Sequence, residues 1–158
     1  IAKGLVYNNT YTSLYLTKRD LSAIEKWEEY NNVKITSDNQ KAVKNADILI
    51  FTVQPRQFDG ILKEIKGALT NKHVLISAIT GYSISRMEEM LGSNYPVIRS
   101  MPNTAISVGK SMTCLCSNVA GEKRIAIAKT RAAELDLKAK KLKAKTTAVL
   151  CLTILNFT

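Results

Sequence analysis

Two segments of the sequence are most informative about the fold: V-I-R-S-M-P-N-T-A, residues 97–105, and A-D-I-L-I-F-T-V-Q-P, residues 46–55. Each is a short β-type run that stops abruptly at a proline, Pro102 in the first and Pro55 in the second. Proline fixes the backbone turn and removes a hydrogen-bond donor. In an open parallel sheet, ligands bind just beyond the carboxyl ends of the strands. The two stretches therefore predict two walls of one ligand crevice.

On either side of these two segments, strand and helix signals alternate along the chain. Apolar, β-prone runs predict strands at 14–17, 33–35, 48–53, 73–78, 96–100 and 112–116. Capping-box spacings predict helix starts between them, at Ser22-x-x-Glu25, Ser37-x-x-Gln40 and Ser85-x-x-Glu88. Consecutive βα units of this length predict an α/β fold, a Rossmann-type doubly wound and mostly parallel sheet.

Composition narrows the class of protein. The chain has 158 residues, is 46% hydrophobic and carries a formal charge of +10, with nine basic and three acidic side chains after Ala120. This basic excess matches no motif that reads nucleic acid, so we expect a solvated charged face and no nucleic-acid partner. The apolar run 146–158 is too short to span a bilayer, and we expect no membrane association.

The three cysteines, at positions 114, 116 and 151, form an odd set without metal-ligand spacing. They indicate a reducing compartment, the cytoplasm, and no bound metal. Cys114 and Cys116 fall on one face of a predicted strand, where small apolar core residues are the favoured interpretation. The lone His73 begins a strand without a catalytic partner at a recognisable spacing and is predicted to be structural.

Three strand ends together resemble the pyrroline-5-carboxylate reductase family. Its members have A-V-K-P, S-(x)-A-A-G and V-x-R-x-M-P-N-T at successive strand ends, and this chain has T-V-Q-P at 52–55, S-A-I-T-G at 77–81 and R-S-M-P-N-T at 99–104. The resemblance covers residues 1–118. It implies an enzyme that passes a hydride from NAD(P)H to the small molecule 1-pyrroline-5-carboxylate, giving L-proline in proline biosynthesis. It also implies a homo-oligomer for the complete family member.

The resemblance implies a partial cofactor domain at 1–118, truncated at its N-terminus. The chain has no G-x-G-x-x-G turn, the motif that holds a dinucleotide pyrophosphate, and it opens on residues similar to the helix that follows that turn. We therefore expect weakened pyrophosphate binding, unpaired backbone in the middle of the sheet and doubtful activity. Residues 119–158 are interpreted as a basic helical segment, the remnant of a helical dimerisation domain. In it, Thr147 is a weak catalytic candidate that a helix-surface or linker role explains better.

The candidate cofactor residues lie at the strand ends. Thr17, Lys18 and Arg19 follow the second strand of the fold, where the absence of an acidic residue favours NADP over NAD. An ordinary solvated turn is the alternative. Asn39 matches a residue that touches the adenine in the family, or is a plain helix-start residue.

Around the nicotinamide, the resemblance implies contacts from Thr52, Val53, Gln54, Pro55, Thr80, Gly81, Met101, Pro102 and Asn103. Gln54 replaces the lysine usual in the family, and Thr80 replaces an alanine. A turn-stabilising role is the alternative for Asn103.

Two other classes of function stay open. One is a Rossmann dehydrogenase of the 6-phosphogluconate or prephenate type, which shares the A-D-(apolar)-V-P strand end but not M-P-N-T. The other is a non-catalytic product, either a pseudogene remnant or a basic binding module.

Overall fold

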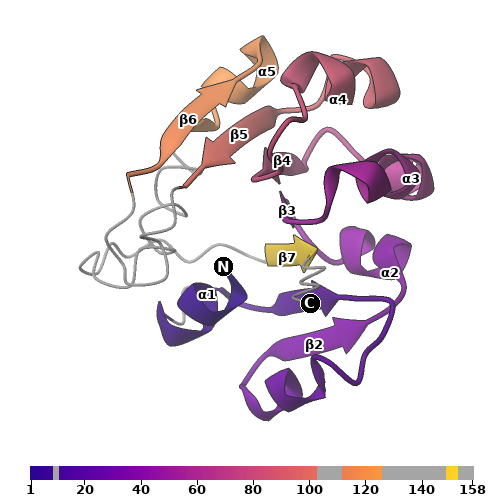
Figure 1. Cartoon of the computed structure of the whole chain (residues 1–158), viewed down its shortest axis with the longest axis vertical. Helices are drawn as coiled ribbons and strands as arrows, with labels where there is room; N and C mark the ends of the chain where they lie inside the picture. The colour runs from indigo at the N-terminus through magenta and orange to yellow at the C-terminus, as the bar shows by residue number, and fades with distance from the viewer. Residues whose placement is uncertain (9–10, 103–111, 126–148, 153–158) are drawn as a thin grey trace.

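The computed structural model describes residues 1–8, 11–102, 112–125 and 149–152. They form one seven-stranded sheet of order β2-β1-β7-β3-β4-β5-β6, which Figure 1 shows from bottom to top. All neighbouring strands are parallel except β5 and β6. The Rossmann-type, mostly parallel sheet is confirmed. The strands are β1 (Leu14–Thr17), β2 (Val33–Thr36), β3 (Ile48–Phe51), β4 (Val74–Ser77), β5 (Val97–Met101), β6 (Cys114–Ser117) and β7 (Val149–Leu152).

The inner strands are buried on both faces, as their continuous apolar runs predict. In β3, Ile48 and Ile50 belong to the core on one face, and Leu49 and Phe51 to the core on the other. This alternation follows from the two-residue period of a strand. A sheet with two apolar faces needs helices on both of them.

One face is covered by α2 (Asn39–Lys44), α3 (Pro55–Ile65) and α4 (Ile84–Leu91), and the other by α1 (Ala2–Asn8), whose Leu5 is fully buried (Figure 1). Pro55 opens α3 at its first turn, where the missing N–H costs nothing. Phe58, Ile61, Leu62 and Ile65 then form the buried stripe of α3. The remaining short helices are the 3-10 helices η1 (Glu25–Glu29) and η2 (Lys66–Ala68), and α5 (Val119–Glu122).

The centre of the sheet differs from the prediction. Residues Val149–Leu152 form a strand, β7, and not part of a helical segment 119–158. β7 pairs in parallel with β1 on one side and with β3 on the other, so the backbone expected to be unpaired there is hydrogen-bonded. The physical reason is that β1 and β3 each present a row of unsatisfied N–H and C=O groups, which any extended segment of suitable length can pair.

The residues that cap α2 and α4 differ from the predicted Ser37 and Ser85. Asp38 caps α2 by accepting from Lys41 N at 2.8 Å, and Ser83 caps α4 by accepting from Arg86 N at 3.0 Å. The predicted box at Ser22 does not form. Its hydroxyl donates to Asp20 Oδ1 at 2.7 Å, in a turn that precedes η1.

The edge strand β6 is anchored by Asn118. The Asn118 side-chain oxygen accepts from Val97 N at 3.0 Å and Gly121 N at 2.8 Å, and its nitrogen donates to Glu88 Oε1 at 2.8 Å and Tyr95 O at 2.9 Å. A Cβ on Gly121 would lie 2.6 Å from Val97 O, so glycine allows this close approach. These contacts fix the β6–α5 corner against β5.

Three smaller predictions can be compared with the structure. His73 is structural, as predicted: it is buried, its Nδ1 lies 2.8 Å from Thr70 N and its Nε2 lies 3.1 Å from Val43 O. Cys114 and Cys116 share a face of β6 but are exposed and not in the core, because β6 is the outermost strand of the described sheet. In the described part of the chain, no helix is both long and apolar enough to cross a membrane.

Candidate cofactor site at the carboxyl edge of the sheet

The parallel register brings the predicted strand ends to one edge of the sheet. Thr17 pairs with Thr36 and Leu152, and Phe51 pairs with Leu152 and Ser77. Ser77 in turn pairs with Arg99. The turns that follow β1, β3, β4 and β5 therefore leave the sheet at the same edge, which is where open α/β sheets bind ligands.

The turn after β1 is polar and cationic. Thr17 is 2% exposed, and its hydroxyl oxygen has no hydrogen-bond partner among the described residues. Lys18 N donates to Thr36 O at 3.3 Å, and the Arg19 side chain is exposed. The neighbouring Asp20 is held by Ser22, whose hydrogen bonds lower the pKa of the Asp20 carboxyl. A buried hydroxyl without a partner beside two cations suits an anionic ligand with acceptor oxygens.

The turn after β3 gives Gln54 a cationic neighbour. Gln54 precedes the first residue of α3 in an extended conformation, with φ −69° and ψ 142°, and leaves the helix N-terminus uncapped by its side chain. Its Oε1 instead accepts from Arg56 Nε at 2.9 Å. Position 54 is a lysine in the family and an uncharged glutamine in this chain. The Arg56 guanidinium contacts this glutamine, so a positive charge still lies beside position 54.

The turn after β4 is tightly built. The Ser77 hydroxyl lies in the core and accepts from Ile79 N at 3.4 Å. Gly81 has φ +74°, a left-handed conformation that favours glycine, and Thr80 beside it is exposed. The backbone of Thr80 and Gly81 therefore has a fixed path at the edge.

Arg99 joins the turn after β4 to the end of β5. Its Nη2 donates to Ile79 O at 3.2 Å and lies 3.3 Å from Met101 Sδ, while its buried Nε has no partner among the described residues. Arg99 was not among the predicted site residues. The sequence signal that could have identified it is its place in the V-x-R-x-M-P pattern, which supported only the family resemblance.

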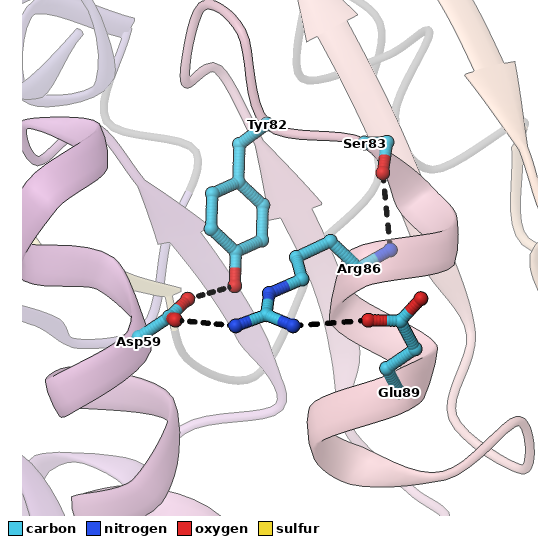
Figure 2. Close-up of polar contacts among 5 residues, drawn as sticks. All are labelled: Asp59, Tyr82, Ser83, Arg86 and Glu89. Atoms are coloured by element: carbon cyan, nitrogen blue, oxygen red, sulfur yellow. Dashed lines mark hydrogen bonds and ion pairs between the residues drawn. The ribbon is translucent and has the colours of Figure 1, made fainter.

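A cluster of four side chains, those of Asp59, Tyr82, Arg86 and Glu89, joins the segment after β4 to α3 and α4 (Figure 2). The Tyr82 hydroxyl donates to Asp59 Oδ1 on α3, and Arg86 on α4 bridges Asp59 Oδ2 at 2.8 Å and Glu89 Oε2 at 3.0 Å. The Tyr82 ring packs edge-on against Phe58, with centroids 4.7 Å apart. These contacts hold Tyr82, the residue after Gly81, against α3, and the ion pair between Arg86 and Asp59 joins α3 to α4.

This cluster shifts the pKa values of its members. Burial, and then the hydrogen bond to Asp59, raise the pKa of Tyr82 to about 12. The hydrogen bonds from Tyr82 and Arg86 lower the pKa of Asp59, and those to Asp59 and Glu89 raise the pKa of Arg86. At neutral pH the phenol is a donor, the carboxylate is ionised and the guanidinium is charged.

The other predicted residues divide into two groups. Asn39 is the first residue of α2, and its Nδ2 donates to Glu64 Oε2 at 3.0 Å, which is consistent with the plain helix-start interpretation. Asn103 and Thr147 lie outside the described residues. Among the residues that are described, no group of three His, Cys, Asp or Glu side chains is placed to hold a metal ion.

Comparison with known proteins places the chain in a family. Residues 1–81 match the model of the family described as NADP oxidoreductase, coenzyme F420-dependent. The chain belongs to this family. Within it, the resemblance to pyrroline-5-carboxylate reductase is confirmed by sequence relatives with that name.

Two of these relatives come from Dictyostelium discoideum. Pyrroline-5-carboxylate reductase 1 is 44% identical over 119 residues, which are 73% of this chain and 21% of the relative. Pyrroline-5-carboxylate reductase 2 is 38% identical over 121 residues, which are 74% of this chain and 40% of the relative. The chain thus spans less than half the length of these two relatives.

Solved structures show the same fold. A pyrroline-5-carboxylate reductase from Coxiella burnetii is 25% identical, with a TM-score of 0.78 over 96% of this chain and 53% of that one. The prephenate dehydrogenase from Aquifex aeolicus has a TM-score of 0.64 over 96% of this chain and 56% of that one, at 15% identity. At that identity the second likeness shows the fold alone.

Proposed function

We propose that this chain forms the nicotinamide-cofactor side of the active site in a pyrroline-5-carboxylate reductase. The observation that carries the proposal is the meeting of three motif-bearing strand ends at one edge of the parallel sheet, fixed by the pairing of Phe51 with Ser77 and of Ser77 with Arg99. In this reaction a hydride passes from NAD(P)H to the imine carbon of 1-pyrroline-5-carboxylate. The cofactor supplies the chemistry, and the protein binds and orients it.

Each turn has a separate task in this proposal. The turn at Thr52–Pro55 and the backbone at Thr80–Gly81 flank the nicotinamide and its ribose, and Met101 and Pro102 close the side formed by β5. Asn103 orients the nicotinamide ribose or the substrate ring through an amide that both donates and accepts. Thr147 keeps only the weak candidacy that its sequence position gives it.

We propose NADPH as the preferred cofactor. The support is the turn Thr17–Arg19, which offers a buried hydroxyl and two cationic side chains at the place where NAD enzymes carry an acidic residue. The solved pyrroline carboxylate reductase from Plasmodium falciparum has NADP bound. A cytoplasmic, homo-oligomeric protein is part of the same proposal, and the free, exposed Cys114 and Cys116 suit a reducing compartment.

We expect this chain to bind the nucleotide without turnover, because its 158 residues include no G-x-G-x-x-G turn and cover only part of the relatives' length. We expect the purified chain to quench or enhance NADPH fluorescence at high nucleotide concentration but to show no oxidation of NADPH that depends on pyrroline-5-carboxylate. In a protein restored with the glycine turn and the remaining length of its relatives, pyrroline-5-carboxylate should be reduced and prephenate should not be oxidised. Turnover of prephenate or 6-phosphogluconate instead would overturn the assignment.

Asn103 gives a residue-level test in that restored enzyme. Asn103→Ala should lower turnover by roughly a hundredfold, the loss that a misplacement of about 1 Å can cause at a reacting centre. The melting temperature should stay nearly unchanged. A large fall in melting temperature with normal turnover per folded molecule would support the turn-stabilising role instead.

A further inference from the structure

The edge of the sheet beyond the cofactor turns carries three sulfur-containing side chains on one face. Cys114 and Cys116 are two residues apart on β6, so both side chains point to the same side, and both are exposed. β6 pairs with β5 so that Met101 lies directly opposite Cys114 and Arg99 opposite Cys116. Directly opposed residues in an antiparallel pair share a face, with Cβ atoms about 5 Å apart.

The other face of β6 is occupied by the core. Leu115 packs against the apolar cluster that includes Ile98 and Leu5, and Leu115 and Ser117 are half-buried. The burial of β6 therefore alternates between exposed cysteines and half-buried neighbours. Contacts of Asn118 with Val97 and Gly121 hold the strand in this register. The three sulfurs are thus presented by a fixed pair of strands.

The spacing of the two thiols disfavours a disulfide between them. Residues two apart on a strand are separated by about 6.6 Å along its axis, and their Cβ atoms point the same way. A disulfide needs its Cβ atoms about 4 Å apart, so closing one would require the strand to buckle. A metal ion bound between the two sulfurs makes a longer bridge than a disulfide, because two metal–sulfur bonds replace one sulfur–sulfur bond. Such a bridge spans this separation without moving the backbone.

We propose that Met101, Cys114 and Cys116 form a binding site for a soft monovalent metal ion, Cu(I) or its analogue Ag(I). Thiolate and thioether sulfur select soft ions, and such ions accept two or three sulfur ligands. Zn²⁺ in a structural site takes four ligands, and the described residues place no third His, Cys, Asp or Glu beside the two cysteines. The sequence predicted no metal here because Met101 joins the two cysteines only through the pairing of β5 with β6.

Charge supports the same ligand. Two thiolates, one neutral thioether and a monovalent cation carry a net charge of −1. Arg99 lies opposite Cys116 in the register, and its Nη2 is 3.3 Å from Met101 Sδ. The guanidinium can therefore balance the excess negative charge of the metal-bound site.

The test is a titration of the whole reduced chain with Cu(I) in the presence of a competing chromophoric chelator, repeated with Ag(I) and with Zn²⁺. We expect one equivalent of Cu(I) or Ag(I) per chain and release of protons as the thiols ionise. Zn²⁺ should bind at least about tenfold more weakly. Absence of Cu(I) uptake by the folded wild-type chain would overturn the proposal.

Variants identify the ligands. Cys114→Ser and Cys116→Ser should each weaken Cu(I) binding by at least about tenfold, since even changes to outer-shell partners of a metal site cost this much. Met101→Leu, which keeps the side-chain volume, should weaken it less but measurably. Cys151→Ser, which alters the remaining cysteine of the chain, is the matched control and should bind like wild type. Unchanged affinity in the Cys114→Ser/Cys116→Ser double variant, or loss of binding in Cys151→Ser alone, would show that the site lies elsewhere.

Discussion

Arg99 donates a hydrogen bond from Nη2 to the backbone carbonyl oxygen of Ile79 at 3.2 Å. The bond joins the end of β5 to the turn after β4 and so couples the two motif-bearing turns. Ile79 is buried and its carbonyl has to be satisfied within the protein. The geometry of the two turns that we propose to flank the nicotinamide therefore depends on the Arg99 side chain.

Removing this side chain should destabilise the fold and loosen the cofactor turns together. Arg99→Ala should lower the free energy of unfolding by about 1.5–3 kcal/mol, the range for a hydrogen bond to a charged group. Urea denaturation followed by the fluorescence of Trp27 measures it. The control is Arg124→Ala, which removes an exposed arginine after α5 and should change stability little. Equal stability of the two variants would show that Arg99 does not hold the turns.

Lys18 and Arg19 should discriminate between the two nicotinamide cofactors. In a chain restored with its glycine turn, the double change Lys18→Ala/Arg19→Ala should weaken NADPH binding by more than about tenfold, because each charge-assisted contact contributes about 1.5–3 kcal/mol. NADH, which lacks the 2′-phosphate, should lose much less. Lys72→Ala, an exposed lysine before β4, serves as control at the opposite edge of the sheet. Equal losses for NADPH and NADH would mean that the turn only tunes surface charge.

Gly81 should tolerate no side chain for a backbone reason and not for lack of space. A Cβ at Gly81 would meet nothing within 4 Å, but the residue has φ +74°. Gly81→Ala should therefore cost about 1–2 kcal/mol of unfolding free energy through left-handed strain. Gly60→Ala, within α3 and equally open, should instead stabilise by about 0.5–1 kcal/mol. Thermal denaturation of the pair gives the comparison, and a shift of the same sign in both would contradict the backbone argument.

The contribution of the Asp59 carboxylate to the free energy of unfolding should decrease at acidic pH. The folded state holds the pKa of Asp59 below its ordinary value, so its contribution to stability is present above the unfolded pKa and is lost as pH falls through the lower folded pKa. Asp59→Asn should be less stable than wild type at pH 7, and the difference should shrink as the pH falls below about 4. Chemical denaturation at a series of pH values tests this. A difference that is independent of pH would point to packing and not to ionisation.

The contribution of Tyr82 to the free energy of unfolding should decrease at alkaline pH, which is the opposite pH dependence to that of Asp59. Its pKa rises from 10.0 to about 12 in the folded chain. The stabilisation is complete below pH 10 and is lost as pH rises toward 12, because the unfolded phenol ionises first. Tyr82→Phe should remove this part of the alkaline destabilisation, whereas Tyr30→Phe, at a half-exposed tyrosine, should leave it in place. Ultraviolet titration of phenolate absorbance should also lose its most alkaline step in Tyr82→Phe.

Local sequence was sufficient to predict strands β1 to β6 and the edge of the sheet at which the cofactor turns meet. The apolar run ending at Phe51 and the proline at the first turn of α3 specify a buried strand followed at once by a helix. The run Val97–Met101 before Pro102 likewise specifies a strand. The predicted cap at Ser85 is wrong, because it is the Ser83 hydroxyl that accepts from Arg86 N.

The alternation of strands and helices and the polar, proline-fixed turns follow from side-chain period and backbone restriction, so the amino-acid sequence alone predicts them. Three features are visible only in the folded chain: Val149–Leu152 pair between β1 and β3, Arg99 reaches Ile79, and Cys114 and Cys116 lie exposed beside Met101. These three facts depend on which segments become neighbours in the sheet. Pairing between segments far apart in the chain depends on which strand edges still have unsatisfied backbone groups in the assembled sheet, and no local pattern of residues encodes this.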